Sequence, residues 1–196
     1  LMYYKIREVL ESDIDRVIVS TDDEEISKIS KDFEAEVIKR PKELAGDKTP
    51  VIDVVSHVLE KLESERYICD IAVLLQPTSP LRTKKDINEA LNSYIKNDCD
   101  SVISVNKIEH SPYWSFKIKE IYLEPLFGYK YLKSRRQELS NIYIPNGAIF
   151  ISSPRILNKY NSFYCKKMLP HIMSTEKSVD IDNEYDFKIA EILIKK

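Results

Sequence analysis

The sequence predicts an α/β fold in one domain, with a mostly parallel sheet. Short β-branched runs alternate with segments of helical spacing through the first half of the chain, a pattern typical of parallel strands joined by helices. Residues 71–75 form a continuous apolar run, as expected of a strand covered on both faces. With 196 residues, the chain is long enough to bury one ordinary core. We therefore treat residues 1–196 as a single domain.

The first elements follow from apolar spacing and from capping residues. Apolar side chains recur at helical spacing over residues 2–11, which predicts a helix there. Residues 16–20 contain three β-branched residues in a row and predict a strand. Thr21 and the acidic residues after it can cap and begin a helix that reaches about Lys31. A second β-branched run predicts a strand at residues 36–38.

The middle of the chain continues the alternation. A polar loop at residues 40–50 leads into helical spacing at 52–62, and the apolar strand at 71–75 follows. Two prolines directly after that strand break it. A helix is predicted at 84–95 and a β-branched strand at 101–105.

After residue 105 the pattern changes. Residues 112–145 are aromatic and basic and lack regular periodicity, which indicates a hairpin or arm inserted into the domain. The α/β pattern then resumes. We expect a buried strand at 146–151, a short helix at 154–160, a last strand at 168–173 and a closing helix at 184–194.

Composition excludes several functional classes. The 30 Lys and Arg against 32 Asp and Glu leave a net charge of −2, which excludes a nucleic-acid or membrane partner held by bulk electrostatics. The three glycines stand too far apart to form a Walker loop or a G-x-G-x-x-G loop. The cysteines form no C-x-x-C pair, no signal peptide is visible, and the longest apolar run is too short to span a bilayer. We therefore expect a cytoplasmic protein.

Two carboxylates near the end of the chain are candidate metal ligands. Asp180 and Asp182 lie two residues apart in an extended segment, so both side chains can point to one side. Paired carboxylates bind hard cations such as Mg²⁺. The alternative is a solvated acidic start to the helix at 184–194, with Asp182 or Asn183 as its N-cap.

Two loops that follow strands are candidate ligand sites, because open α/β sheets bind ligands at the carboxyl ends of their strands. The loop after the apolar strand holds Gln76 among prolines and ends in Arg82, which can serve an anion. Its alternative interpretation is a strand exit followed by a helix N-cap at Thr83. The loop at 40–50 begins with the planar guanidinium of Arg40 and ends at a helix N-terminus, a natural anion site. An ordinary capped loop explains it equally well.

Three further features lie in or after the arm. Two adjacent arginines at 135–136 are costly to bury without an anion, so a carboxylate or phosphate partner is plausible. The Asn-Gly pair at 146–147 is a hairpin-turn signal that here opens a strand. Phe163 and Tyr164 either belong to the core or form a wall against an apolar sugar face.

Taken together, these residues resemble the N-acylneuraminate cytidylyltransferases, also called CMP-sialic acid synthetases. The resemblance covers nearly the whole chain, keeps the order of the motifs, and implies a Rossmann-like, three-layer nucleotidyltransferase fold. The motifs are Val19-Ser20-Thr21-Asp22-Asp23, Arg40-Pro41 with Glu43-Leu44-Ala45 and Asp47, residues 74–82, Arg136-Gln137 with Leu139, Asn146-Gly147-Ala148-Ile149-Phe150, and Asp180-Ile181-Asp182.

The resemblance implies a step of sialic acid biosynthesis: transfer of CMP from CTP to the anomeric hydroxyl of a nine-carbon acidic sugar, N-acetylneuraminate or a related nonulosonate, with release of pyrophosphate. Asp180 and Asp182 would hold Mg²⁺ against the triphosphate, and Asp182 and Arg136 would be catalytic. The nucleotide would be contacted by Arg40, Asp47, Thr49 and Val51. The sugar pocket would be lined by Gln76, Arg136, Gln137, Phe150, Phe163 and Tyr164.

The resemblance also implies a homodimer, in which the arm at about 112–145 reaches into the partner's site. The chain departs from the family at three positions. Val51 stands where the family often has Ser or Thr, Phe150 where Tyr is common, and Ser140 where Pro is usual. A larger departure is at the front, where the family's first strand and its phosphate-gripping loop of Arg, Ser, Lys and Gly are absent.

Two interpretations of that absence compete: a fragment of a full-length enzyme, or a degenerate, non-catalytic dimerising homologue. The initial Leu1 and the intact pair of Asp180 and Asp182 favour the fragment, so we expect little synthetase activity from residues 1–196 alone. Two other functions stay open. One is a cytidylyltransferase for another acidic sugar, such as 3-deoxy-octulosonate. The other is a phosphatase that uses the same two aspartates, which is disfavoured because such a nucleophile normally follows an early buried strand.

Overall fold

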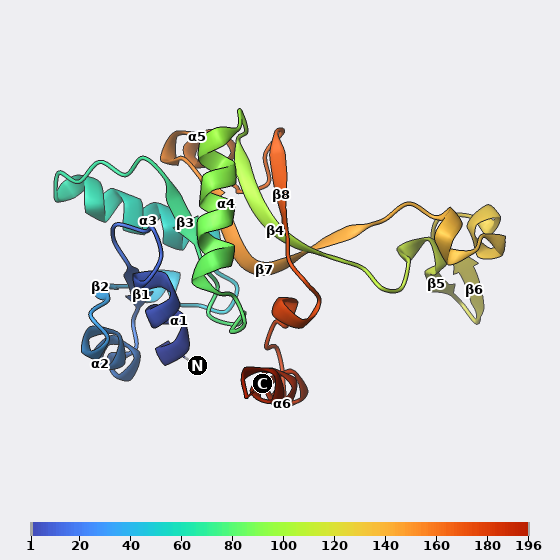
Figure 1. The fold of residues 1–196 in the computed structure, drawn as a ribbon, viewed down its shortest axis with the longest axis horizontal. Helices are drawn as coiled ribbons and strands as arrows, with labels where there is room; N and C mark the ends of the chain where they lie inside the picture. The colour runs from blue at the N-terminus through green and yellow to red at the C-terminus, as the bar shows by residue number, and fades with distance from the viewer. Residues whose placement is uncertain (1, 196) are drawn as a thin grey trace.

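A computed structural model describes residues 2–195 of the chain (Figure 1). The expected alternation of helices and strands is confirmed. The first half contains α1 (Met2–Leu10), β1 (Ile18–Thr21), α2 (Glu24–Asp32), β2 (Glu36–Lys39), α3 (Val51–Ser64), β3 (Ala72–Leu74), α4 (Lys84–Lys96) and β4 (Ser101–Lys107). The second half contains β5 (Phe116–Lys119), β6 (Tyr122–Pro125), β7 (Tyr143–Ser152), α5 (Pro154–Tyr160), β8 (Met168–Ile172) and α6 (Glu184–Ile194), with short 3-10 turns η4 (Arg136–Glu138) and η5 (Glu176–Ser178).

Side-chain caps set where several helices begin. The Ile26 amide donates to Asp23 Oδ1 at 2.8 Å at the start of α2. Thr83 caps α4 as expected, in a reciprocal arrangement with Asp86. At α6 the sequence leaves two candidate caps open, and the structure selects Asn183, whose side chain accepts from the first-turn amides. Asp182 is thereby left out of the cap.

The central sheet has the strand order β3–β7–β4–β8. Strands β3, β4 and β8 run in one direction, as the sequence predicts, but β7 runs antiparallel to both of its neighbours. The sheet is therefore mixed. The reason is connectivity: β4 leads out into the arm and β7 brings the chain straight back, with no crossover helix between them, so the two strands must oppose each other.

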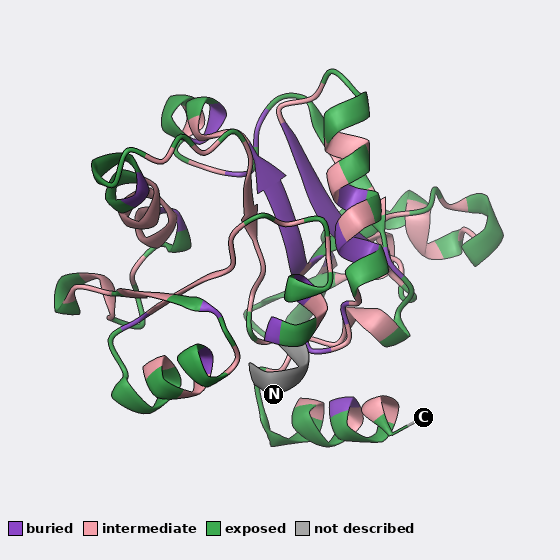
Figure 2. Cartoon of the chain, turned by 60° about the vertical axis from the view of Figure 1, so that its left-hand side comes forward, coloured by how far each residue is buried: buried purple, intermediate pink, exposed green. Residues whose placement is uncertain are grey.

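Helices cover both faces of this sheet, which confirms the three-layer α/β class. One face packs against α1 and α4 in a core of Val9, Ile87, Ala90, Val102, Ala148, Ile149, Ile151 and Met173. The other face packs against α3 and α5 in a core of Ile52, Ile103, Val105, Phe150, Leu157 and Phe163. Residues 102–103 of β4 and 149–151 of β7 alternate between the two cores, as the pleat requires. Figure 2 shows the burial concentrated on the central strands and on the side of α4 that faces them.

Strands β1 and β2 form a separate parallel pair. On the opposite side of the domain, the segment between β4 and β7 projects as an arm (residues 108–142; Figure 1). The hairpin of β5 and β6 lies at its far end. Tyr113 stacks on Tyr131 with ring centroids 4.5 Å apart, and Trp114 Nε1 donates to the Tyr131 carbonyl at 3.0 Å. The expectation of a hairpin or arm is confirmed. Among the described residues, no helix has the length and apolarity needed to cross a bilayer.

Candidate functional site

Two segments that are far apart in the chain meet beside β7. The Ile181 amide donates to the Thr78 carbonyl at 2.9 Å, so the segment before α6 lies along the loop after β3. Gly147 lies between the side chains of these segments. A Cβ atom there would lie 2.6 Å from Gln76 Oε1 and 3.3 Å from Asp180 Oδ2. The structure therefore brings Gln76 and Asp180, which the sequence places in separate motifs, to the same glycine.

This close approach depends on a bulge in β7. The β4–β7 register shifts between Ile103 and Val105, so residues 146–149 of β7 stand opposite Ser104 alone. Gly147 has φ of +75°, in the region that favours glycine. The Asn-Gly pair is thus not a turn. It is the start of a bulge inside a strand that begins three residues earlier than the sequence predicts.

Buried side chains replace the strand hydrogen bonds that the bulge interrupts. The Ala148 amide donates to Asn146 Oδ1 at 3.2 Å, and the Ile149 amide donates to Ser104 Oγ at 2.7 Å. Ser104 Oγ in turn donates to Asn146 Oδ1 at 2.6 Å. Because both amides are satisfied, the bulge is held in one conformation.

The two candidate metal ligands have different surroundings. Asp180 Oδ1 is buried and accepts no hydrogen bond from the described residues, whereas Asp182 is exposed at the bend before α6. A buried carboxylate oxygen without a donor suits a hard cation. Residues 2–195 contain no cluster of three or more metal-binding side chains. The unpartnered oxygen of Asp180 is thus the feature that fits a cation such as Mg²⁺, which commonly takes further ligands from phosphate and water.

A cavity of about 200 Å³ opens next to Gln76. Phe150 and Phe163 form its buried wall with ring centroids 5.7 Å apart, and the exposed Tyr164 lies edge-on to Phe150 at 6.2 Å. The whole lining consists of Pro50, Val51, Ile52, Leu74, Gln76, Phe150, Asn161, Ser162, Phe163 and Tyr164. Five residues that the resemblance assigns to the nucleotide or the sugar thus lie together at one cavity.

The N-terminus of α3 borders this cavity through Pro50, Val51 and Ile52. Among the described residues, no side chain caps this helix end, and the Asp53 amide donates to the Pro50 carbonyl at 3.0 Å. The amides that precede Asp53 in the first turn can therefore donate to an anion in front of the helix. Thr49 directly precedes Pro50, and its amide donates to the Gly46 carbonyl at 2.9 Å. The loop that the sequence singles out therefore ends beside the aromatic cavity.

Arg40 and Asp47 lie at the start and in the middle of that loop. The guanidinium of Arg40 is partly committed, because Nη2 donates to the Ser20 carbonyl at 2.5 Å and Nε to Ser20 Oγ at 3.3 Å. These two hydrogen bonds hold the Arg40 side chain at the carboxyl ends of β1 and β2. Asp47 is exposed.

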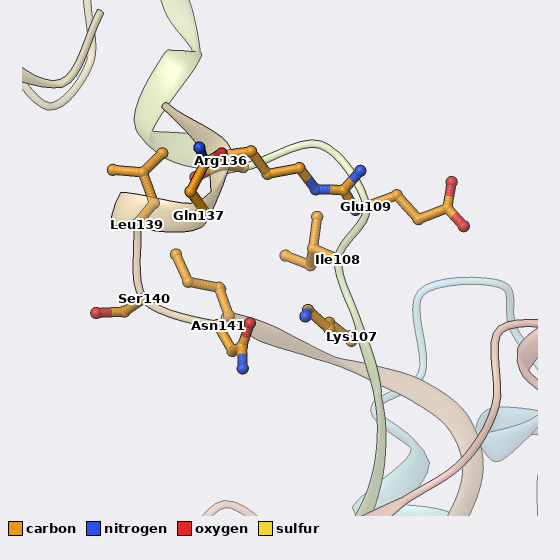
Figure 3. Close-up of a pocket in the computed structure, with 10 residues that line it drawn as sticks. Lys107, Ile108, Glu109, Arg136, Gln137, Leu139, Ser140 and Asn141 are labelled. Atoms are coloured by element: carbon orange, nitrogen blue, oxygen red, sulfur yellow. The ribbon is translucent and has the colours of Figure 1, made fainter. Parts of the chain in front are cut away.

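Arg136 and Gln137 lie apart from the aromatic cavity. They belong to η4 in the arm, where they line a second cavity of about 350 Å³ between the outgoing and returning segments (Figure 3). Arg136 extends across this cavity toward the segment that carries Glu109 (Figure 3). Both side chains are exposed. Within one chain, the structure does not bring them to Gln76 or Phe150.

The expectation that Arg82 serves an anion is wrong. This side chain is 4% exposed, and its Nη1 donates to the Ala148 carbonyl at 2.7 Å and to the Gln76 carbonyl at 3.3 Å. Burial lowers the pKa of Arg82 to about 10, which leaves it charged at neutral pH. The buried guanidinium lies beneath the loop after β3. From there its hydrogen bonds join that loop to the bulge of β7.

Sequence reasoning missed the residues that hold Asp180 in place. Lys177 Nζ lies 2.9 and 2.8 Å from the two carboxylate oxygens of Asp86. Burial opposes ionisation of Asp86, but hydrogen bonds from Lys177 and Thr83 outweigh it and lower the pKa of that carboxyl. No local signal in the sequence marks the bulge, because Ser104 is one of two buried serines in β4, with Ser101 as the other.

Comparison with known proteins identifies the family of this chain. The chain matches the protein family described as Cytidylyltransferase over residues 1–177. It is 32% identical over 200 residues to an N-acylneuraminate cytidylyltransferase of Escherichia coli O18:K1:H7, with 100% of this chain and 46% of that protein covered. It is 30% identical over 186 residues to a CMP-N,N'-diacetyllegionaminic acid synthase of Legionella pneumophila, with 92% of this chain and 78% of that protein covered.

The chain spans about half the length of the N-acylneuraminate cytidylyltransferases that it matches. A solved structure, that of a CMP:2-keto-3-deoxy-manno-octonic acid synthetase complexed with CTP, covers 98% of this chain and 86% of its own, with a TM-score of 0.70 and 15% identity. At that identity, the likeness shows the fold alone. The expected nucleotidyltransferase fold is confirmed.

Proposed function

The chain belongs to the cytidylyltransferase family, and from that premise we propose that it transfers CMP from CTP to the anomeric hydroxyl of a nine-carbon acidic sugar. The observation that carries the proposal is the position of Gln76. Its amide oxygen faces Asp180 across Gly147, and the same residue lines the aromatic cavity. One side chain therefore joins the candidate metal carboxylate to the candidate sugar pocket.

In the proposed reaction, the anomeric oxygen forms a bond to the α-phosphorus of CTP. The bond between the α-phosphorus and the bridging α–β oxygen breaks, pyrophosphate leaves with that oxygen, and the hydroxyl proton passes to solvent or a base. Mg²⁺, held by Asp180 and Asp182, would neutralise charge on the phosphates. Arg40, Asp47, Thr49 and Val51 would contact the nucleotide, and the uncapped N-terminus of α3 offers amide donors to an anion.

The aromatic side chains suit the sugar part of the product. Phe150, Phe163 and Tyr164 present apolar ring surface that can pack against the carbon skeleton and acyl groups of a sugar, while Gln76 supplies a donor and an acceptor. A nine-carbon sugar is favoured over 3-deoxy-octulosonate because the relatives at 30–32% identity are named for N-acylneuraminate and diacetyllegionaminate. The octulosonate synthetase is similar in fold only.

Arg136 and Gln137 would act in the site of a second subunit. In one chain they lie in the arm, apart from Gln76, and the arm carries a run of exposed apolar side chains that includes Phe116, Ile118 and Ile121. We infer a homodimer in which each arm brings Arg136 to the carboxylate or phosphate of the partner's substrates. The three widely spaced, unpaired cysteines favour a cytoplasmic location.

The proposal is tested by incubating the full gene product with CTP, Mg²⁺ and an acidic sugar. The sugars are N-acetylneuraminate, legionaminate and pseudaminate derivatives, with 3-deoxy-octulosonate as the comparison. We expect release of pyrophosphate and formation of a CMP-sugar with at least one nine-carbon sugar. Release of inorganic phosphate instead would indicate a phosphatase. Turnover of the octulosonate alone would assign the other acidic sugar, and no turnover with any sugar would indicate a non-catalytic homologue.

A further inference from the structure

Three contacts hold η5 and the residues directly after it to the rest of the domain. Turn η5 is held to α4 by the ion pair of Lys177 with Asp86. It is held to the bulge of β7 by a hydrogen bond of 2.8 Å from Asn146 Nδ2 to Ser178 Oγ. After Asp180, the Ile181 amide donates to the loop that follows β3. Of the two fastenings that precede Asp180, the one at Ser178 is nearest to it in the chain.

Asn146 is 5% exposed and uses its whole amide group. Its oxygen accepts from Ser104 Oγ and from the Ala148 amide, which supports the bulge. Its nitrogen donates to Ser178 Oγ and lies 3.4 Å from Met173 Sδ. A primary amide has two donor hydrogens and one oxygen with two lone pairs, so this side chain has no capacity left for a ligand. Its contacts therefore indicate a role in positioning other residues.

Ser178 passes this constraint to the segment that carries Asp180. Its hydroxyl accepts from Asn146 and donates to the Ser174 carbonyl at 2.8 Å, which closes the turn. Two residues later, the Asp180 carboxylate lies against Gly147, the neighbour of Asn146 in the bulge. Asn146 thus supports the bulge and, through Ser178, also holds the segment that carries Asp180 against that bulge.

We propose that Asn146 is a positioning residue, which acts through Ser178 to hold the Asp180 carboxylate against Gly147 and Gln76 in the geometry that binds the divalent cation. The inference rests on the proposed function for the role of the cation. It adds that one buried network holds both the bulge of β7 and the segment that carries the metal ligand, so that loosening Ser178 weakens the metal site without removing any ligand.

The decisive variant is Ser178→Ala. It removes the acceptor for Asn146 Nδ2 but leaves the hydrogen bonds of Asn146 to Ser104 and Ala148, which hold the bulge. Ser174→Ala is the matched control, because it makes the same chemical change in the same segment, and Ser174 takes part in the network through its backbone carbonyl. Asn146→Asp is the second variant, since an ionised carboxylate keeps the acceptors and loses the donor.

The first measurement is the amide hydrogen exchange of Ile181 in the full gene product. This amide reports whether the segment stays on the loop after β3. We expect Ser178→Ala to raise its exchange rate about fivefold, the effect of losing one ordinary hydrogen bond, and Ser174→Ala to leave it unchanged. Equal rates in the two variants would overturn the proposal. Unfolding midpoints measured alongside show whether any change is local.

The second measurement is the affinity for Mn²⁺, followed by the electron paramagnetic resonance of the free ion. We expect binding to weaken severalfold in Ser178→Ala and Asn146→Asp and to stay unchanged in Ser174→Ala. Faster exchange at Ile181 with unchanged Mn²⁺ affinity would also overturn the positioning role. Asp180→Asn tests the metal site separately from the positioning role. If this variant binds Mn²⁺ as the unmodified protein does, Asp180 is not a metal ligand. The exchange rate of the Ile181 amide still tests whether Asn146 and Ser178 hold the segment in place.

Discussion

Gln76 lies so close to Gly147 that a Cβ atom at residue 147 would lie 2.6 Å from Gln76 Oε1. Real Cβ atoms essentially never approach another heavy atom so closely, so Gln76 would have to move if residue 147 carried a side chain. Asp180 Oδ2 lies 3.3 Å from the same position. The glycine therefore lets the side chains of Gln76 and Asp180 approach the backbone of β7 at one residue.

We expect Gly147→Ala to lower kcat/KM for CMP transfer by about tenfold or more. The added methyl group displaces the Gln76 side chain, and a misplacement of about 1 Å in a substrate-positioning residue can lower the rate by up to about a hundredfold. Gly128→Ala is the matched control. Gly128 also has a positive φ, of 90°, but a Cβ there would meet nothing within 4 Å. Both variants should lose about 1–2 kcal/mol of stability from backbone strain. Equal losses of activity in the two variants would show that strain alone matters.

We expect Asp182→Asn to abolish most Mg²⁺-dependent transfer and to leave the unfolding midpoint nearly unchanged, because this exposed carboxylate accepts no cap hydrogen bond at α6. The metal dependence of the transfer rate is the measurement. Glu184→Gln, which neutralises an exposed carboxylate in the first turn of the same helix, serves as the control. If Asp182→Asn retains full activity at low Mg²⁺, Asp182 is not a metal ligand.

We expect Lys177→Met to destabilise the fold at neutral pH by about 1–2 kcal/mol, since it leaves the buried Asp86 carboxylate without its cation and Lys177 itself is partly exposed. The pKa of Asp86 is lowered in the folded state, so the pair stabilises above the unfolded pKa, about 3.9, and this contribution is lost as the pH falls through the folded pKa. Urea unfolding near pH 7 and near pH 3 measures the difference.

The difference in unfolding free energy between Lys177→Met and the unmodified protein should narrow as the pH falls through the folded-state pKa of Asp86, because the protonated carboxyl no longer pairs with Lys177. Lys167→Met is the control for losing a lysine in an ion pair. Its partner Asp98 is almost fully exposed, so we expect little change at either pH. A difference for Lys177→Met that stays constant with pH would show that the loss comes from packing.

We expect subunits with Arg136→Ala to complement subunits with Gln76→Ala. Each variant alone should have little activity. After the two are mixed and allowed to exchange subunits, about a quarter of all sites combine an intact Gln76 with an intact partner arm, so about a quarter of the activity should return. Absence of recovery, in a mixture shown to contain mixed dimers, would place Arg136 in the site of its own subunit.

Much of the fold could be predicted from local sequence patterns. Helix starts at Thr83 and Asn183 follow from side chains that bond to nearby amides, and the strand at 71–75 follows from its apolar run. The direction of β7 could not be predicted in this way. A buried strand has the same composition whether its neighbours run parallel or antiparallel, and the choice depends on the arm that connects it to β4.

Arg82 and Ser104 show the same limit within the site. The local pattern predicts an anion contact for Arg82 and an ordinary strand position for Ser104. Arg82 is buried under the loop that it stabilises, and Ser104 replaces a missing strand partner across the sheet. Each role depends on a backbone group far away in the chain, so no periodicity or motif in the surrounding residues reveals it.

The sequence by itself determined the class of the fold, the order of its elements, and the motifs that mark the cytidylyltransferase family. Only the tertiary structure decided which of those motifs share a site. Gln76 and Asp180 meet at Gly147 because the bulge in β7 turns the glycine toward them. Arg136 lies away from them because it belongs to the arm, which extends outward between β4 and β7. Local hydrogen bonding and apolar spacing set the elements, whereas the register across the sheet sets their meeting points, and register is a property of long-range packing.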